Sequence, residues 1–343
     1  MEKKVTMQDI ADQLNISKNS VSQALSGKPG VSEETRRLVR NTADELGYSY
    51  SNSRNQKQVE KKTQKNIALI ASDYAFSLKS FFGEIYLSIE KELRVRGMNL
   101  FIEPIDSISI ENLTLPSLLT NHNIDGVLIL SHISTDYTAK IISTGIPTVL
   151  IDHHEPSLQS DSILTNNRFG AFTAVEHLIR LGHQDIAFVG DVDISPSYQE
   201  RLEGYLLALR RYGINPKESL ILTNAKEHLN EINLFIDDLE DQPSAWFCVN
   251  DGLGFLVTSV LQQRGLMIPE DVSVCSFDNG QLSQIATPRI TTMDIDLNYF
   301  GKKAVEQLCW RMENKEEPIQ EILLPTKLII RESTAKKRQQ SSR

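Results

Sequence analysis

Residues 5–48 read VTMQDIADQLNISKNSVSQALSGKPGVSEETRRLVRNTADELGY, and this stretch decides the fold of the N-terminal segment. Thr6, Ser17 and Ser32 stand where a hydroxyl accepts a hydrogen bond from the first turn of a helix. Residues expected to face inward recur at helical spacing in each segment: Ile10, Ala11 and Leu14; Val21, Ala24 and Leu25; Leu38, Val39, Thr42 and Leu46. Two short helices joined by a tight turn, with a third bracing them, predict an all-α helix-turn-helix head.

The second of these helices supplies the candidate DNA contacts, because its N-terminal end enters the major groove in this motif. We predict that Lys18, Asn19 and Gln23 read bases, since Lys suits guanine acceptors and Asn or Gln suits adenine. The residues predicted to hold phosphates are Thr6, Ser17, Ser22, Ser32, Tyr48 and, farther along, Arg54. A solvated helix face explains any one of these residues nearly as well, but it does not explain the whole set.

The charge distribution agrees with a small DNA-binding head. The chain of 343 residues has a net charge of −9, which by itself argues against nucleic acid. Residues 1–65, however, hold 12 Lys and Arg against 8 Asp and Glu, whereas residues 66–343 hold 24 against 37. Phosphate contacts need local positive charge rather than a basic protein overall.

Composition and length narrow the classes of protein to which the chain can belong. The length predicts two or three domains, and a hydrophobic fraction of 40% is that of a globular protein. No apolar run approaches the roughly 18 residues that span a bilayer, and the N-terminus lacks a signal-peptide pattern. Cys248, Cys275 and Cys309 are odd in number and far apart, which favours a reducing, cytoplasmic location over disulfides or zinc. We expect no metal and no cofactor.

The same 44-residue stretch resembles the head of the lactose-repressor (LacI/GalR) family. That family's pattern runs V-T-x-x-D-[IV]-A, then V-S-x-x-T-V-S-R-x-L-N, then V-S-x-x-T-R-x-x-V and L-x-Y. The resemblance places the family's base-reading positions at Lys18, Asn19 and Gln23, the last of which is commonly Arg. It implies a homodimer, with a tetramer as the alternative, whose two heads read a near-palindromic double-stranded operator.

The linker departs from this resemblance. The family usually continues Y-x-P-N-x-x-A-x-x-L, a hinge helix that wedges a Leu into the minor groove, whereas residues 49–65 read SYSNSRNQKQVEKKTQK. Tyr50 stands at the proline position and Lys57 at the wedge position. Minor-groove wedges are apolar, so we expect the wedge to be absent or altered. Arg54, Lys57 and their basic neighbours then contribute ionic contacts from a flexible linker.

From Asn66 onward, strand-like apolar runs alternate with amphipathic helices, which predicts a body of two doubly wound α/β lobes. The family resemblance extends across this body, notably in EHLIRLGHQDIAFVG, WFCVNDGLG and DVSVCSFDN, and implies a periplasmic-binding-protein-like fold whose chain crosses three times between lobes. The expected domains are residues 1–48 (head), 49–65 (linker) and 66–343 (ligand binding and dimerisation). The expected N-lobe covers about 66–162 and 291–324, and the C-lobe about 163–290 and 325–335.

Ligand-binding candidates fall at strand ends and helix starts, where doubly wound sheets bind ligands. Asp152, Arg201, Asn250 and Asp278 offer the carboxylate, guanidinium and amide groups that bind vicinal hydroxyls, and they match the family's sugar-contacting positions. We interpret Asp251 as a helix N-cap instead. On the opposite wall, Asp73 is an expected hydroxyl acceptor, and Phe76 or Phe81 covers an apolar sugar face. Phe81 and Phe82 fit a helix core equally well.

These patterns predict a cytoplasmic, sugar-responsive transcription regulator, expected to be a repressor of sugar metabolism with a sugar or sugar-phosphate effector. A regulator that answers to a phosphoprotein corepressor is an alternative. A periplasmic-type solute-binding protein explains the body but leaves the head unexplained. An enzyme that uses Asp152 and Asp278 as acid and base has the same weakness, and the sequence shows no G-x-G-x-x-G, Walker loop or nucleophile elbow.

Overall fold

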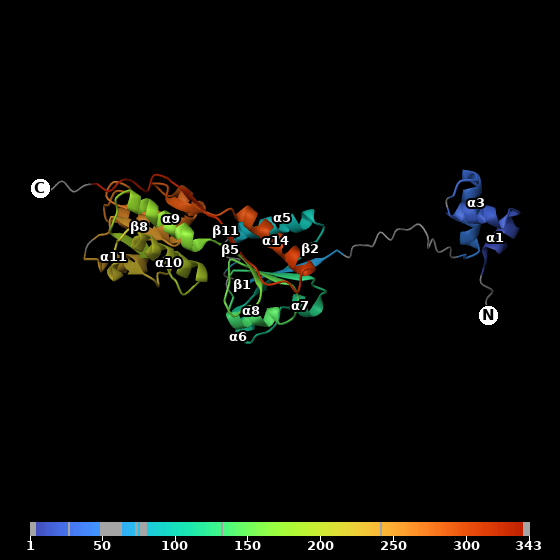
Figure 1. Ribbon diagram of the computed structural model, residues 1–343, viewed down its shortest axis with the longest axis horizontal. Helices are drawn as coiled ribbons and strands as arrows, with labels where there is room; N and C mark the ends of the chain where they lie inside the picture. Colours follow the sequence, from blue (N-terminus) through green and yellow to red (C-terminus); the bar gives the residue numbers. More distant parts are fainter. Residues whose placement is uncertain are drawn as a thin grey trace. The chain divides into compact units, whose positions relative to one another are not determined.

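The computed structural model describes residues 5–26, 28–48, 64–72, 75, 81–131, 133–240 and 242–338. The chain divides into two compact units, Met1–Thr63 and Gln64–Arg343, each with its own core (Figure 1). No helix in the described ranges is long and apolar enough to cross a membrane.

The smaller unit consists of three helices, α1 (Met7–Leu14), α2 (Lys18–Ser26) and α3 (Glu33–Glu45). All three predicted caps are present: the backbone N–H groups of Asp9, Ser20 and Thr35 donate to the hydroxyls of Thr6, Ser17 and Ser32. The core is small and apolar, made of Ile10, Ala11, Val21, Ala24, Val39 and Ala43. The prediction that Leu38 faces inward is wrong, because Leu38 is 51% exposed. Successive helical residues point about 100° apart, so burying Val39 turns Leu38 outward.

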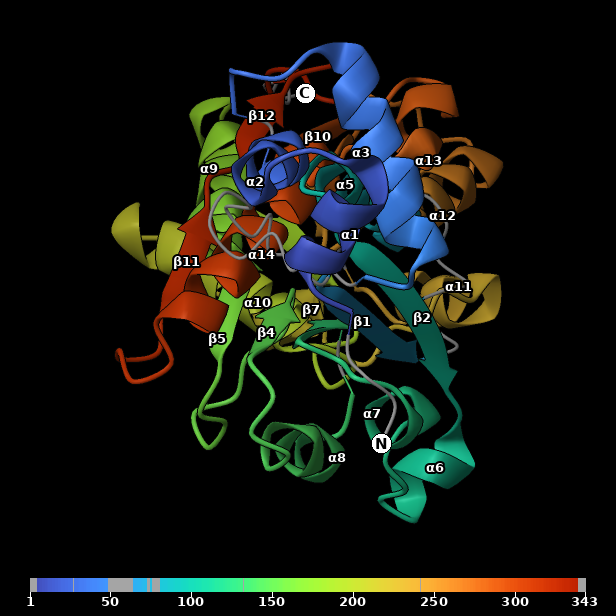
Figure 2. The same cartoon turned by 90° about the vertical axis from the view of Figure 1, so that its right-hand side faces the viewer.

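The larger unit contains two six-stranded sheets. The first has the order β11-β5-β4-β3-β1-β2, and all its neighbouring strands are parallel. Figure 2 shows this row of strands from β11 to β2. The strands are β1 (Asn66–Ser72), β2 (Asn99–Ile105), β3 (Gly126–Leu130), β4 (Thr148–Ile151), β5 (Asp161–Thr165) and β11 (Glu321–Leu324). This sheet and its helices form the N-lobe.

Helices cover both faces of the first sheet, as the alternation within β1 shows. Ile67 and Leu69 belong to one apolar cluster with Ile85 of α5 (Phe82–Val95) and Leu308 of α14 (Leu297–Glu313). Ala68 and Ile70 belong to a second cluster, which contains Tyr137 of α8 (Thr135–Ile142). Successive strand residues point to opposite faces, so a strand buried on both sides is apolar throughout. The short helices α6 (Ser107–Glu111) and α7 (Ser117–Asn121) complete the lobe.

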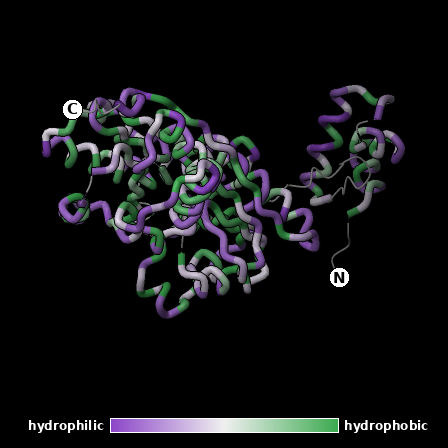
Figure 3. Tube along the Cα trace, turned by 60° about the vertical axis from the view of Figure 1, so that its left-hand side comes forward, coloured by the Kyte–Doolittle hydropathy of each residue, from purple (hydrophilic) through white to green (hydrophobic). Residues whose placement is uncertain are grey.

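The second sheet has the order β12-β10-β9-β8-β6-β7, and only its edge strand β12 is antiparallel. Its strands are β6 (Ile186–Val189), β7 (Ile221–Leu222), β8 (Ala245–Cys248), β9 (Ser273–Asp278), β10 (Thr291–Asp294) and β12 (Lys327–Ile329). Its helices are α9 (Asn167–Arg180), α10 (Pro196–Arg211), α11 (Leu229–Asp237), α12 (Asp251–Gln263) and α13 (Gln281–Ile285), with the 3₁₀ turn Glu218–Leu220. These elements form the C-lobe, and Figure 3 shows hydrophobic stretches running through the interior of the unit.

Two predicted lobe assignments are wrong. Strand β5, expected to open the C-lobe at residue 163, pairs with β4 and β11 in the first sheet. Strand β10, expected in the N-lobe from residue 291, pairs with β9 and β12 in the second sheet. The chain therefore crosses between the lobes after β5, after β10 and between β11 and β12. Three crossings occur, as expected, but the first two lie a few residues later than predicted.

Candidate functional site

A cavity of about 380 Å³ lies between the two lobes at the carboxyl ends of their strands. Its N-lobe wall includes Ser72, Phe81, Phe82, Ser131 and Asp152. Its C-lobe wall includes Ile194, Ser195, Ser197, Tyr198, Arg201, Glu227, Asn250, Asp251, Gly252, Asp278, Gly280, Gln281 and Leu282. The structure thus brings the sequence-predicted residues Asp152, Arg201, Asn250 and Asp278 to one enclosed site of a size that suits a small ligand.

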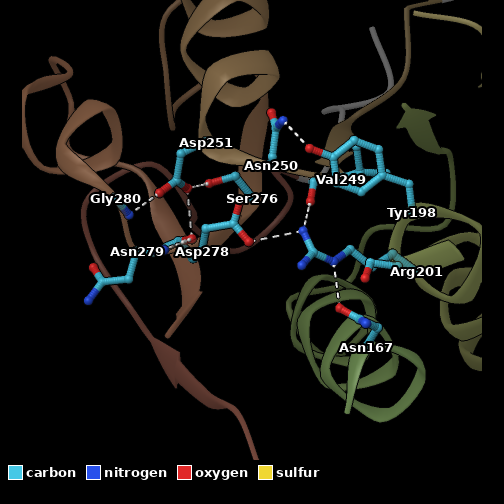
Figure 4. Close-up of polar contacts among 12 residues, drawn as sticks. Asn167, Tyr198, Arg201, Val249, Asn250, Asp251, Ser276, Asp278, Asn279 and Gly280 are labelled. Carbon is cyan, nitrogen blue, oxygen red and sulfur yellow. Dashed lines mark hydrogen bonds and ion pairs between the residues drawn. The ribbon is translucent and has the colours of Figure 1, made fainter. Parts of the chain in front are cut away.

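Arg201 is the centre of the C-lobe wall. It sits on α10 and is 2% exposed. Its Nε donates to Asn167 Oδ1 at 2.9 Å, and its Nη1 donates to the Val249 carbonyl at 2.5 Å and to Asp278 Oδ1 at 3.0 Å (Figure 4). The guanidinium also lies 3.8 Å from the centre of the Phe277 ring. A buried guanidinium held on this many sides has a fixed orientation, which a ligand-recognising group needs.

The two polar atoms of the Asn250 amide have different roles. Its Oδ1 accepts a hydrogen bond from the Leu253 N–H at 2.8 Å and thereby caps α12. Its Nδ2 donates to the Tyr198 hydroxyl at 2.7 Å (Figure 4) and to Glu227 Oε1 at 2.7 Å. The cap fixes the rotation of the amide, so the side chain orders two further cavity residues.

Burial in the cavity makes the carboxyl groups of Asp152 and Asp278 harder to ionise. Asp152 follows β4 with a positive φ of 56° and accepts a hydrogen bond from Ser197 Oγ at 3.2 Å across the lobes. Burial raises the pKa of Asp152 to about 7, and the charge of Asp278 adds to this effect while Arg201 opposes it. Burial also raises the pKa of Asp278, against the influence of Arg201. Raised pKa values of carboxyl groups in a cleft are typical of functional sites.

The interpretation of Asp251 as the helix N-cap is wrong, because the cap is Asn250. Asp251 instead joins β9, β10 and the start of α13. Its Oδ1 accepts hydrogen bonds from Ser276 at 2.5 Å and Thr292 at 2.8 Å, and its Oδ2 accepts from the Gly280 N–H at 2.5 Å. Asp251 therefore holds the loop that carries Asp278. Burial raises its pKa to about 7.

The apolar side of the cavity comes from the N-lobe. Phe81 and Phe82 line it, with their ring centroids 5.0 Å apart and nearly perpendicular. Phe82 is also buried in the N-lobe core and Phe81 packs against that core, as the helix-core interpretation expects, whereas the covering of a sugar face by Phe81 stays a prediction. The predicted contacts Asp73 and Phe76 lie outside the described residues.

On the smaller unit, the predicted base readers share the outer face of α2. Lys18 and Asn19 are exposed, and Gln23 is partly buried with its amide against Gly30. Thr6, Ser17 and Ser32 are exposed but already serve as helix caps, whereas Ser22 and Tyr48 are partly buried. Arg54 and the rest of the predicted linker up to residue 63 lie outside the described residues.

Comparisons with known proteins agree with both units. Residues 6–51 match the family model "Bacterial regulatory proteins, lacI family", and residues 175–334 match the model "Periplasmic binding protein-like domain". The HTH-type transcriptional repressor CytR of Escherichia coli (strain K12) is 31% identical over 337 residues, which cover 97% of each protein. The chain belongs to the lacI family of bacterial regulatory proteins.

Solved structures extend this lacI-family assignment to the fold. The complex of the transcriptional regulator CelR with cellobiose is 25% identical, with a TM-score of 0.71, and covers 96% of this chain and 99% of that one. A lacI-family regulator from Enterococcus faecium with bound ribose is 27% identical, with a TM-score of 0.67 over 80% of this chain and 100% of that one. The protein is therefore a DNA-binding transcription regulator, and its relatives are regulators rather than enzymes.

Three of the polar residues that sequence reasoning missed in this regulator's cavity region are hydrogen-bonded to the predicted residues Arg201 and Asn250. Tyr198 and Glu227 line the cavity, and Asn167 holds the Nε of Arg201. Asn167 and Tyr198 lie near the N-termini of α9 and α10, so the rule that ligands bind beyond the carboxyl ends of strands points to them. Glu227 lies in a loop between β7 and α11 that has no periodic pattern.

Proposed function

We propose that this regulator binds a sugar-type effector in the interlobe cavity and represses genes of sugar metabolism in the cytoplasm. The observation that carries the proposal is the pairing of a polar wall around Arg201 with an aromatic wall of Phe81 and Phe82. A sugar ring presents hydroxyls at its edge and carbon–hydrogen groups on its faces, so it uses both walls. The bound cellobiose and ribose of the related structures support the same class of ligand.

The hydrogen-bonding inventory supports a polyhydroxy ligand. Arg201 Nη2 makes no hydrogen bond with the described chain, so it is free to donate to a ligand oxygen. The second carboxylate oxygens of Asp152 and Asp278 likewise have no partner in the described ranges and are free to accept. A hydroxyl both donates and accepts, so vicinal hydroxyls satisfy both kinds of group. Unsatisfied buried polar atoms are costly, and the ligand removes that cost.

On the DNA side, we infer that Lys18, Asn19 and Gln23 contact base edges. Support comes from the exposure of Lys18 and Asn19 and from the absence of any hydrogen bond from their side chains to the described chain. Thr6, Ser17, Ser22, Ser32 and Tyr48 are the inferred phosphate contacts. The hydroxyls of Thr6, Ser17 and Ser32 lie at helix N-termini, where backbone N–H groups also favour phosphate.

The regulator is further proposed to act as a homodimer. Large apolar side chains are exposed on one helix and one strand of the N-lobe, at Leu87, Val95 and Ile102, and on α13 of the C-lobe, at Ile285. Contact with a second copy would bury these side chains, and two-fold symmetry makes the same surface available on both copies.

Operator binding by two matched amide variants tests the DNA part of the proposal. Asn19→Ala removes an inferred base contact, and we expect it to weaken binding to the chain's own promoter DNA about tenfold or more, since a bidentate base contact contributes ~1–3 kcal/mol. Asn41→Ala removes an exposed amide from α3 and should leave binding unchanged. Gel shifts should also show two chains per duplex. Equal losses in the two variants, or no sequence preference in the unaltered protein, contradict the proposal.

A further inference from the structure

The effector cavity holds more carboxyl groups than cations. Among the described lining residues, Asp152, Glu227, Asp251 and Asp278 are acidic, and Arg201 is the single basic residue. Asp251 is occupied by donors from Ser276, Thr292 and Gly280, so it acts as part of the scaffold. The ligand therefore faces the other three carboxyl groups and one guanidinium.

Arg201 neutralises one of these three groups. Its Nη1 is paired with Asp278 Oδ1, and its other hydrogen bonds within the described chain go to the neutral oxygens of Asn167 and Val249. Glu227 receives only the neutral amide of Asn250 at Oε1. Asp152, which is 8% exposed and lines the cavity, receives only the hydroxyl of Ser197 at Oδ1, and its Oδ2 has no partner in the described chain. Among the described residues, Asp152 and Glu227 thus make no ion pair, although the charge of Arg201 lowers the pKa of Asp152.

These groups interact with one another as well as with the ligand. Burial raises the pKa of Asp152, the charge of Arg201 lowers it, and the Asp278 charge raises it to a smaller extent. The pKa of Asp278 is raised by burial and, in smaller part, by the Glu227 charge. Buried charges are costly unless they are paired. The described lining of the cavity, without ligand, therefore carries more negative than positive charge.

Building on the function proposed above, we propose that the effector carries a protonated amine beside its hydroxyls, as an amino sugar does, and that Asp152 and Glu227 select for this amine. A neutral hydroxyl satisfies the hydrogen bond of a carboxylate but leaves its charge unpaired. An ammonium group supplies both donors and charge. A phosphate ester adds two negative charges and only acceptors, so sugar phosphates are disfavoured by the same carboxylates.

Matched ligand series test the proposal on the full-length protein. Thermal shift and isothermal titration compare glucose, glucosamine and glucose 6-phosphate, and then the galactose and mannose equivalents. In at least one series we expect the amine to bind about tenfold more tightly than its neutral parent, a difference of ~1.4 kcal/mol. In each series we expect the phosphate ester to bind most weakly. A phosphate ester that binds more tightly than its parent, or no amine preference in any series, overturns the proposal.

Two conservative variants locate the preference. Glu227→Gln and Asp152→Asn keep the size and most hydrogen bonds of each side chain but remove its charge. Each should reduce the amine-to-parent affinity ratio several-fold, because the amine loses an ionic contact whereas the neutral parent loses only part of a hydrogen bond. Glu270→Gln, an exposed carboxylate outside the cavity, is the matched control and should not change the ratio. An unchanged ratio in both cavity variants refutes the roles of these residues.

Proton release on ligand binding distinguishes an ammonium ligand, which pairs with the ionised carboxylate, from a neutral ligand that only forms hydrogen bonds. Because a cation stabilises the ionised form of Asp152, amine binding should release protons near neutral pH, and amine affinity should rise between about pH 6 and pH 7. Titrations in buffers of different ionisation enthalpy measure this release.

If a neutral sugar shifts operator affinity and no amine binds better, the effector function stands and the amine proposal fails. If no sugar of any kind changes operator affinity, the effector function itself fails.

Discussion

At the scale of single residues, Asp152 is where ligand binding and stability oppose each other. Its backbone adopts the left-handed region, with φ at 56°, which Asp and Asn tolerate better than other side chains with a Cβ. Its pKa rises from an ordinary 3.8 to about 7 on folding, mainly through burial. The folded state therefore binds this proton more tightly than the unfolded state, and stability is lost as the pH rises from about 4 to about 7.

Asp152→Asn should therefore stabilise the protein without ligand at pH 8, while weakening selection of the effector. We expect a rise in melting temperature of about 2–4 °C per kcal/mol recovered, and a much smaller difference at pH 4, where the carboxyl is protonated in both states. Differential scanning calorimetry across this range measures the trend. Glu111→Gln, an exposed carboxylate of the same lobe, serves as the control. A variant that is less stable at pH 8 than at pH 4, relative to the parent, contradicts the prediction.

The strand-end rule explains which site residues were predictable from sequence. Asp152 and Asp278 each follow an apolar strand, and Asn250 follows β8 at the start of a helix, so their convergence needed only the α/β pattern. Glu227 was not predictable, because a loop without periodicity gives no indication of where its side chain points. Asp251 was assigned the wrong role because a cap and its neighbour look alike in sequence. Only the geometry shows which carbonyl or carboxylate accepts from the first turn.

At the scale of elements, the sequence predicted that strands exist better than it predicted which sheet they join. Residues 161–165 and 291–294 form strands, yet each pairs in the lobe opposite to the one expected. A strand's apolar pattern records that its faces are buried, not which neighbour buries them. The crossing points consequently carry no local signal, and only pairing across the sheet locates them.

His154 joins three elements from both lobes near one of these crossings. It follows β4, and its Nε2 lies 3.2 Å from Glu200 Oε1 on α10, while its Nδ1 lies 3.2 Å from Glu321 Oε1 on β11. The hydrogen bond with Glu200 is the main reason that the pKa of His154 rises from 6.5 to about 9, with Glu321 adding to the rise and burial opposing it. Glu200 also accepts from Asn167, which holds Arg201. The histidine thus links the lobes outside the cavity lining.

This arrangement predicts a pH-dependent contribution to stability. A histidine whose folded pKa is raised stabilises fully below about pH 6.5, and the stabilisation disappears as the pH rises through about 9. His154→Gln should lower the melting temperature at pH 6 by about 2–4 °C for each kcal/mol lost and have little effect at pH 10. Thermal unfolding at several pH values measures this difference. His228→Gln, which changes a histidine of the C-lobe outside this bridge, is the control. A penalty that is the same at pH 6 and pH 10 rules out the charged bridge.

At the scale of the whole molecule, regulation requires that effector binding to the larger unit change the free energy of operator binding by the smaller unit. The larger unit holds the cavity, and the smaller unit carries the α2 face proposed to read DNA. If an effector changes operator affinity by some factor, thermodynamic linkage requires the operator to change effector affinity by the same factor. Couplings of this kind typically amount to about 5–150-fold.

We therefore expect equal factors from two independent titrations: operator binding with and without saturating effector, and effector binding with and without saturating operator. The variants proposed above make this expectation sharper. Asn19→Ala should weaken operator binding but leave effector affinity of the DNA-free protein unchanged, because it alters only a DNA contact. Asp152→Asn should change effector affinity while the DNA-reading face stays intact.

Unequal factors in the unaltered protein would show that effector and operator do not act on one shared equilibrium. An Asn19→Ala effect on effector binding without DNA would show that the head influences the cavity even when no operator is present.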